Sequence, residues 1–337
     1  MELELSEDQE FFLETTRKFL AAEAPIPVVR ALEHEPAGFA RDYWRRGAEL
    51  GWTSMLVPED DGGGCLSEHG LLDLALIAEE MGRQVAPGPL VPVNLVASAV
   101  AAGGTTEQKA ALLPGLLAGT DVAAWTGPAV VEASAQADSY VLRGAVAPVE
   151  AGAEASHLLV PVRDTNGITH LLVPTDADGV TITPLAGLDL VRRFAEVRFD
   201  DAFVPSSAVV GVAGAAADEV ERLLQIACAL GCAESCGVAD RCFEMTLEYM
   251  GDRYSFGRPI SSYQALKHRM ADNKMWLEAC HATATAAVRA VGSGHPDAAE
   301  LVSVAKQWIG PHVTELIQDC VQLHGGIGVT WEHDLHL

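Results

Sequence analysis

Cationic residues are scarce in this sequence. Its 337 residues include 22 Lys and Arg against 47 Asp and Glu, which gives a formal net charge of −25. A surface this acidic would repel the phosphates of nucleic acids and of anionic lipid headgroups. We therefore expect neither a nucleic-acid partner nor a membrane partner.

Signals for export, membrane insertion and disulfide formation are also missing. The N-terminal stretch MELELSEDQE has no cationic region of the kind that begins a signal peptide. The most apolar stretch, PGPLVPVNLVASAVAAGG, is interrupted by proline and glycine, which argues against a membrane span. The seven cysteines are an odd number without paired spacing, as is usual for free thiols in a reducing compartment. These features predict a cytoplasmic protein.

Fingerprints of metal sites and of parallel nucleotide-binding sheets are weak. Cys228, Cys232 and Cys236 recur every four residues on one helical stripe, which indicates small core residues rather than zinc ligands. The polar side chains of the C-terminal WEHDLHL are expected to be solvated. No glycine fingerprint or strand–helix alternation indicates a parallel dinucleotide fold. We expect no metal site.

The sequence does contain three stretches of different periodicity. Residues 1–118 repeat apolar positions at helical spacing, starting from a capping box at Ser6 and Gln9. Residues 119–212 contain short β-branched runs divided by Gly, Asp, Asn and Pro, as in antiparallel strands with tight turns. Helical spacing returns in residues 213–337. The prediction is an α+β protein with an N-terminal helical domain, an antiparallel β domain and a C-terminal helical bundle, bounded by these ranges.

The segment RYSFGRPI, residues 253–260, joins two long helical patterns. A plain joint needs a C-cap glycine and at most a proline. This joint also carries an arginine, a hydroxyl and an aromatic residue, a combination suited to a flat anionic ligand. A capped helical hairpin with an exposed arginine is the competing interpretation of the local pattern.

Four motifs in this order resemble the acyl-CoA dehydrogenase family along the whole chain. They are LSEDQEFF near the N-terminus, EVRFDDAFVP in the β domain, DRYSFGRPISSYQALKHRMADN at the joint, and QLHGGIG near the C-terminus. The resemblance implies a C-terminal four-helix bundle, FAD as cofactor and α,β-desaturation of an acyl-CoA thioester. It also implies an electron-transfer flavoprotein or a similar acceptor. In this family FAD lies across a subunit boundary.

The resemblance further implies which residues bind FAD. Arg253 would neutralise the pyrophosphate, and Gln264 would support the site from the following helix. The glycine pair would let the backbone approach the adenosine side closely. The implied cofactor residues are Arg253, Ser255, Phe256, Ile260, Tyr263, Gln264, Gln322, Gly325 and Gly326, with Trp125 and Thr126 on the flavin side.

The chain departs from the family pattern on the flavin side. Gly127 replaces an acidic residue, and Pro148 and Glu150 fall where the family has a flavin-contacting tryptophan and threonine. The usual position of the catalytic carboxylate lies beyond Leu337, and its variant position is Ala227. Cys228 stands where an arginine often helps to hold CoA. No catalytic residue is assigned to this chain.

These departures predict a subunit that completes a partner's site. The residues that would contact a neighbour's FAD are present, whereas the flavin side is degraded and the base is missing. The chain resembles the degenerate subunit of actinobacterial heterotetrameric acyl-CoA dehydrogenases, some of which act on bulky substrates such as sterol side chains. Two alternatives stay open: a self-sufficient homotetramer with a truncated C-terminus, and a redox-silent thioester-binding scaffold.

Overall fold

The computed structural model describes residues 5–337. Residues 1–4 belong to the acidic N-terminal stretch from which we predicted that there is no signal peptide, and they lie outside the described residues. Helices come first, strands follow and helices return, so the predicted order of structure types is confirmed. The chain forms two compact units, one of residues 5–28, 75–86 and 228–337, the other of residues 29–74 and 87–227. The boundaries at residues 118 and 212 stay a prediction.

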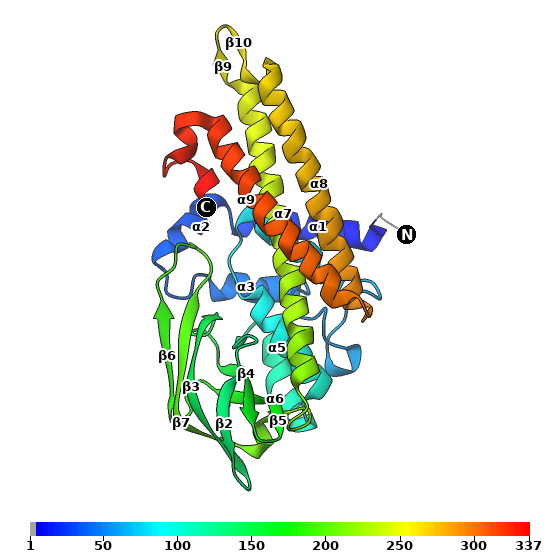
Figure 1. Cartoon of the computed structure of the whole chain (residues 1–337), viewed down its shortest axis with the longest axis vertical. Coiled ribbons are helices and arrows are strands. Elements are labelled where there is room, and N and C mark those ends of the chain that lie inside the picture. Colours follow the sequence, from blue (N-terminus) through cyan, green and yellow to red (C-terminus); the bar gives the residue numbers. More distant parts are fainter. Residues whose placement is uncertain (1–4) are drawn as a thin grey trace. The chain divides into compact units, whose positions relative to one another are not determined.

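The first unit is helical (Figure 1). Its helix α1 begins at the predicted capping box, where the Gln9 amide donates to Ser6 Oγ at 3.2 Å and the Ser6 amide donates to Gln9 Oε1 at 3.1 Å. Its core lies among the long C-terminal helices and is rich in alanine, cysteine, leucine and valine. Its helices are α1 (Glu7–Glu23), α8 (Gln264–Gly292) and α9 (Ala298–His324), with the larger parts of α4 (Gly70–Gln84) and α7 (Ala217–Asp252).

Two glycines set the close approach of α4 to α7. A Cβ built on Gly237 of α7 would lie 1.9 Å from the Glu79 carbonyl oxygen of α4. A Cβ on Gly82 of α4 would lie 2.1 Å from the Glu234 carbonyl oxygen of α7. No larger residue fits at either contact without moving a backbone. The approach brings the side chains around Glu79 against the middle of α7.

Helix α7 is long and apolar enough, by length and composition alone, to cross a membrane. Half of its most apolar window is buried inside the chain, as in the core helix of a globular protein. The buried side of α7 includes Cys232 and Cys236, both of which are under 2% exposed. Burial raises the pKa of the Cys232 thiol to about 11, which fits the predicted core role of this cysteine stripe.

The bundle differs in one detail from the implied four-helix form. Among described residues 217–337 there are three long helices, and the chain after α9 forms 3-10 turns at Gly325–Val329 and Asp334–His336. Three glycines within residues 325–328 disfavour continued α-helix, because glycine loses the most backbone freedom on ordering.

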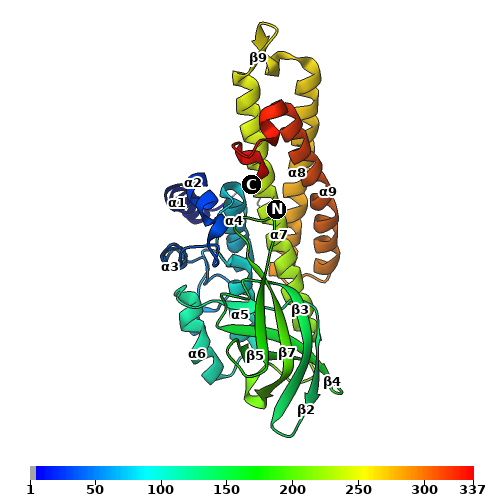
Figure 2. The same cartoon turned by 90° about the vertical axis from the view of Figure 1, so that its left-hand side faces the viewer.

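The second unit combines short helices with a sheet (Figure 2). The sheet order is β6-β7-β3-β2-β4-β5-β8, with β1 also paired to β4. Its helices include α3 (Arg41–Glu49), α5 (Leu90–Gly103) and α6 (Thr106–Leu117), and α2 (Ile26–Ala31) leads into it. The strands are β1 (Ala123–Trp125), β2 (Val131–Ala135), β3 (Ser139–Glu150), β4 (His157–Asp164), β5 (Gly167–Pro174), β6 (Val180–Leu185), β7 (Phe194–Pro205) and β8 (Val209–Val210).

The sheet is mixed rather than wholly antiparallel as predicted. β1 and β2 both run parallel to β4, while the other pairings are antiparallel. A parallel pair needs a long crossover connection. Here β3 and its flanking turns supply that connection, a non-local arrangement that alternation within each strand does not reveal.

Candidate cofactor-binding site

The segment between α7 and α8 is a β-hairpin and not a simple helix joint (Figure 1). Strand β9 (Tyr254–Ser255) pairs with β10 (Arg258–Pro259), and Phe256 and Gly257 form the turn. Their φ angles are 52° and 80°, so both residues are left-handed, as in a type I′ turn. Phenylalanine is rare at left-handed φ angles, so the sequence around Phe256 does not predict the turn.

The hairpin brings together most of the residues predicted at the joint. Phe256 is 96% exposed at its tip. Arg253, at its base, is exposed and forms no ion pair within residues 5–337. Ile260 packs against the bundle core, whereas Gln264 is exposed at the start of α8. Tyr263 donates a hydrogen bond from its hydroxyl to the Ser255 carbonyl oxygen at 2.9 Å.

The glycine turn at the end of α9 lies beside the last turns of α7. The His324 ring stacks on the Tyr249 ring of α7 with centroids 4.4 Å apart. His324 Nδ1 lies 2.8 Å from the Cys320 carbonyl oxygen and must donate to it. Burial lowers the pKa of His324, so the neutral ring is favoured. The predicted cofactor residues of the hairpin and those of the glycine turn therefore lie near the same end of α7.

Gln322, Gly325 and Gly326 are all exposed in this turn. Gly325 has a φ of 65°, which favours glycine. A Cβ built on either glycine would meet no atom within 4 Å, so both face open space. The predicted close approach of a ligand to this backbone is sterically possible.

Positive charge gathers around the hairpin in an otherwise acidic chain. Residues 253–269 contain Arg253, Arg258, Lys267 and Arg269 but no Asp or Glu. Arg269 pairs with Asp319 of α9, and Arg258 lies over the Tyr263 ring. Arg253 and Lys267 are left without an ion pair in the described part of the chain. This end of the bundle suits an anion.

These groups fit the adenosine diphosphate half of FAD. A free guanidinium can donate two parallel hydrogen bonds to a pyrophosphate. The exposed Phe256 ring offers an apolar face, and the Gln322 amide offers both a donor and an acceptor. Arg253 would hold the phosphates, with Gln322 and the Gly325 backbone beside the adenosine.

Trp125 and Thr126, predicted on the flavin side, belong to the second unit. Both are buried, at 7% and 2% exposed. The Trp125 Nε1 and Thr126 Oγ1 atoms are buried without a hydrogen-bond partner among the described residues. Such atoms normally have partners in a finished site. Their chemistry fits a polar ring edge of a flavin in this unit.

The departures at Pro148 and Glu150 have a local structural setting. Pro148 is exposed within an irregularity of the β3–β7 pairing between Val146 and Val149. Proline cannot donate to the ladder, so it is accommodated at such an irregularity. Glu150 Oε2 lies 3.4 Å from Arg192 Nη1, and this ion pair offsets a carboxylate charge that would otherwise repel a reduced flavin.

The variant base position offers no carboxylate. Ala227 and Cys228 are half-buried on α7. Glu221, six residues earlier, is exposed and accepts a hydrogen bond from Gln225 Nε2 at 2.9 Å. An exposed carboxylate held by its own helix is poorly placed to remove a substrate proton.

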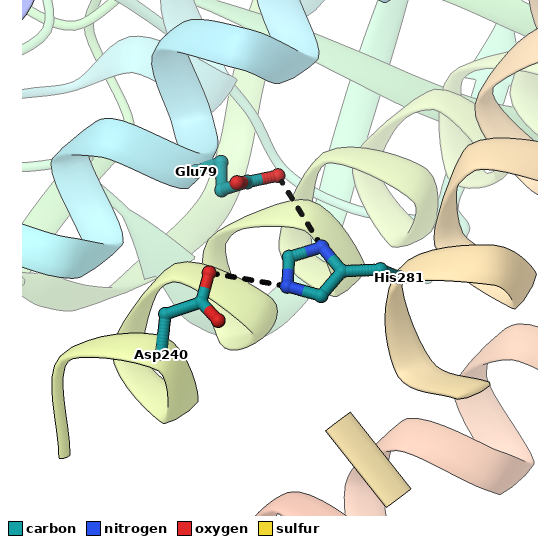
Figure 3. A group of neighbouring side chains, drawn as sticks. All are labelled: Glu79, Asp240 and His281. Carbon is teal, nitrogen blue, oxygen red and sulfur yellow. Dashed lines mark hydrogen bonds and ion pairs between the residues drawn. The ribbon is translucent and has the colours of Figure 1, made fainter. Parts of the chain in front are cut away.

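Sequence reasoning missed a polar cluster of Glu79, Asp240 and His281, which come from α4, α7 and α8 (Figure 3). His281 Nε2 lies 3.1 Å from Asp240 Oδ2, and His281 Nδ1 lies 3.8 Å from Glu79 Oε2. The hydrogen bond to Asp240 raises the pKa of His281, and burial raises the pKa of Glu79. No spacing in the sequence indicates this cluster, because its members are distant in the chain.

This cluster is better described as an ion-paired helix junction than as a metal centre. Both ring nitrogens of His281 already face carboxylate oxygens. Arg83 Nη1 lies 3.4 Å from the same Asp240 oxygen, and its Nη2 lies 2.6 Å from Glu244. The cations of the chain therefore neutralise these acids without a metal.

A cavity of about 400 Å³ lies elsewhere in the first unit. It is mostly apolar and is lined by the end of α4, by α7 and by the C-terminal residues. None of the predicted cofactor residues lines it, so we do not assign it to the cofactor site.

Comparison with known proteins identifies related sequences across the chain. The sequence model of the acyl-CoA dehydrogenase N-terminal domain matches residues 6–120, and that of the C-terminal domain matches residues 216–337. Acyl-CoA dehydrogenase IpdE2 of Mycobacterium tuberculosis is 30% identical over 332 residues, covering 98% of this chain and 89% of the relative. IpdE2 of Mycolicibacterium smegmatis is 29% identical over 334 residues, covering 99% and 91%.

Solved structures with the same fold include heteromeric ones. The ChsE4-ChsE5 complex from Mycobacterium tuberculosis contains a chain with a TM-score of 0.91 and 26% identity, covering 100% of this chain and 91% of that one. The Tcur3481-Tcur3483 steroid ACAD gives a TM-score of 0.87 and 28% identity, covering 98% and 90%.

Proposed function

The chain belongs to the acyl-CoA dehydrogenase family, and on that premise we propose that it is the flavin-completing subunit of a heteromeric acyl-CoA dehydrogenase. FAD is the cofactor of the family. When bound, FAD supplies the hydride acceptor for α,β-desaturation of an acyl-CoA thioester. In our proposal this chain contributes binding groups to an FAD whose flavin ring is held by an unlike partner.

The observation that carries this proposal is the outward presentation of the hairpin residues. Phe256 is 96% exposed on a left-handed turn, and Arg253 beside it has no ion pair within residues 5–337. A large apolar side chain in a disfavoured conformation needs a compensating contact. A cofactor held largely by another subunit would provide that contact.

The residues of this chain have distinct roles in the proposed complex. Arg253 neutralises the pyrophosphate, and Ser255 adds a hydroxyl. Phe256 and Ile260 cover the cofactor from the hairpin side, while Gln322 and Gly325 contact its adenosine end. We assign proton removal from the substrate to the partner, because within residues 5–337 the variant position 227 is an alanine and Glu221 is exposed.

Related proteins support the choice of partner and substrate. The ChsE4-ChsE5 complex contains two different subunits, and the Tcur3481-Tcur3483 protein is a steroid ACAD. By analogy we propose a heterotetramer acting on a bulky acyl-CoA such as a sterol-derived one. We further propose that it works in the cytoplasm and passes electrons to an electron-transfer flavoprotein or similar acceptor.

A self-sufficient dehydrogenase is the second candidate. The unpartnered Thr126 Oγ1 and Trp125 Nε1 favour it, because they are polar atoms that a flavin in this chain's own second unit could engage. The ion pair of Glu150 with Arg192 also offsets the carboxylate charge that would repel a reduced flavin in this unit.

Flavin content separates the two candidates. The chain would be purified alone, then together with a candidate partner, an unlike acyl-CoA dehydrogenase subunit from the same genome, and FAD quantified by absorbance. We expect little FAD in the chain alone and about one FAD per pair of unlike subunits in the complex. Stoichiometric FAD in a homo-oligomer that oxidises an acyl-CoA would reject the heteromeric function.

A further inference from the structure

The β9–β10 hairpin is weakly stabilised by its own strands. It contains two residue pairs, Arg258 with Ser255 and Pro259 with Tyr254. Pro259 has no N–H to donate, and an isolated two-stranded hairpin is marginal in water. The turn residue Phe256 is in the left-handed region and 96% exposed, so no packing within the described chain favours that conformation.

One side chain, Tyr263, contacts both strands from outside the ladder. Its hydroxyl donates to the Ser255 carbonyl oxygen of β9 at 2.9 Å. Its ring lies under the Arg258 guanidinium of β10, with the guanidinium carbon 3.9 Å from the ring centroid. Tyr263 is also the N-cap residue of α8, so its backbone is fixed to a long helix.

The base of the hairpin is closed next to Arg253. The Ile260 amide donates to the Arg253 carbonyl oxygen at 2.8 Å, and the Tyr263 amide donates to the Ile260 carbonyl oxygen at 3.1 Å. These bonds connect the Arg253 backbone to the start of α8. The orientation of Arg253 and Phe256 therefore depends on the same small region that Tyr263 holds together.

We propose that Tyr263 is a positioning residue that fixes the hairpin so that Arg253 and Phe256 meet the cofactor. This inference rests on the proposed function and changes the role that the family resemblance implies for Tyr263, that of lining FAD. The hydroxyl and one ring face of Tyr263 are already engaged within the chain. Arg258 is engaged by the same ring, which leaves Arg253 as the free guanidinium of the hairpin.

The first measurement needs only this chain. Tyr263→Phe removes the hydroxyl and keeps the ring under Arg258. Hydrogen exchange of residues 253–263 should become about five- to tenfold faster, as expected for one lost hydrogen bond. The melting temperature should stay the same. Tyr254→Phe is the matched control, because Tyr254 is 63% exposed and donates no side-chain hydrogen bond within residues 5–337.

The second measurement uses the complex with the unlike subunit and FAD itself as ligand. Tyr263→Phe should weaken FAD binding by at most the factor by which it speeds exchange, because the apparent Kd depends on the fraction of hairpins that are in the binding conformation. Titration of the apo complex with FAD measures the change, since a positioning residue affects the bound population. Tyr263→Leu, which also removes the Arg258 contact, should enlarge both effects.

The outcomes separate this inference from the function on which it rests. Weaker FAD binding with unchanged hydrogen exchange would make Tyr263 a direct contact and overturn the inference. Faster exchange with unchanged FAD binding would also overturn it, provided that Arg253→Ala still weakens FAD binding. If neither Tyr263→Phe nor Arg253→Ala alters FAD binding, the proposed function itself fails.

Discussion

At the scale of single residues, Arg253 is the side chain on which cofactor retention should depend most. We predict that Arg253→Ala in the complex weakens FAD binding by roughly 10- to 100-fold. A hydrogen bond to a charged group contributes about 1.5–3 kcal/mol, and each 1.4 kcal/mol changes affinity about tenfold. Titration of the apo complex with FAD measures the change.

Lys267→Ala is the control for this substitution. Lys267 is also exposed, lies in the same acid-free segment and has no ion pair in the described residues. If attraction between net charges alone retains FAD, the two substitutions should have equal effects. A clearly larger effect of Arg253→Ala would indicate a specific contact of its planar guanidinium.

His281 should make stability depend on pH. The hydrogen bond to Asp240 raises the pKa of His281 above its ordinary value of 6.5, which means that the folded chain binds the proton more tightly than the unfolded one. The stabilisation is complete below about pH 6.5 and is lost as the pH rises through the higher folded value. Burial raises the pKa of Glu79, which acts in the same direction.

We therefore predict that His281→Gln lowers the free energy of unfolding most at acidic pH. Urea unfolding from about pH 5.5 to about pH 9 should show that the difference in unfolding free energy between wild type and variant becomes smaller as the pH rises. His268→Gln, at an exposed position on the same helix, is the control. If the difference in unfolding free energy between wild type and His281→Gln stays constant over this range, His281 does not bind its proton more tightly in the folded chain.

At the scale of elements, the contact of α4 with α7 depends on Gly237. We predict that Gly237→Ala destabilises the fold by on the order of 1–3 kcal/mol, because its Cβ would lie 1.9 Å from a backbone oxygen of α4. Gly231→Ala in the same helix is the control. Its Cβ would meet nothing within 4 Å, and alanine in a helix should add about 0.5–1 kcal/mol of stability. Equal effects on denaturant midpoints would refute this account of the helix contact.

The elements predicted from the sequence are those with strong local signals. The capping box at Ser6 and the long helix that precedes residue 253 are confirmed, and the β-branched runs of residues 119–212 do form strands. The parallel pairings of β4 were missed because they depend on connections through β3. The hairpin was missed because Phe256 is not a residue that type I′ turns favour.

The candidate site was predictable where its residues are neighbours in the sequence. Arg253, Phe256 and Ile260 lie in one short motif, and the structure places them in one hairpin. Glu79, Asp240 and His281 carry no local signal, and they meet only because glycine lets α4 and α7 approach. The role of Tyr263 was not predictable either, since a motif does not say which of its members already has a partner.

At the scale of the whole molecule, we predict that the chain alone cannot be made catalytic by one carboxylate. Ala227→Glu places a base at the family's variant position on a helix that tolerates glutamate. Without a bound flavin there is no hydride acceptor, so assays with acyl-CoA should show no turnover. Ala227→Gln controls for the added volume. Turnover by Ala227→Glu alone would reveal a flavin in this chain's own second unit and favour the self-sufficient candidate.

The division of the chain into units bears on its biosynthesis. The second unit is drawn from residues 29–74 and 87–227, so all of it has left the ribosome before the three-segment first unit is complete. The first unit is complete only when residues 228–337 pack with its two earlier segments. Helix α1 therefore lacks these partners during most of translation. Because domains generally fold as units during synthesis, the sheet can form first, and the hairpin that carries Arg253 is among the last parts to become ordered.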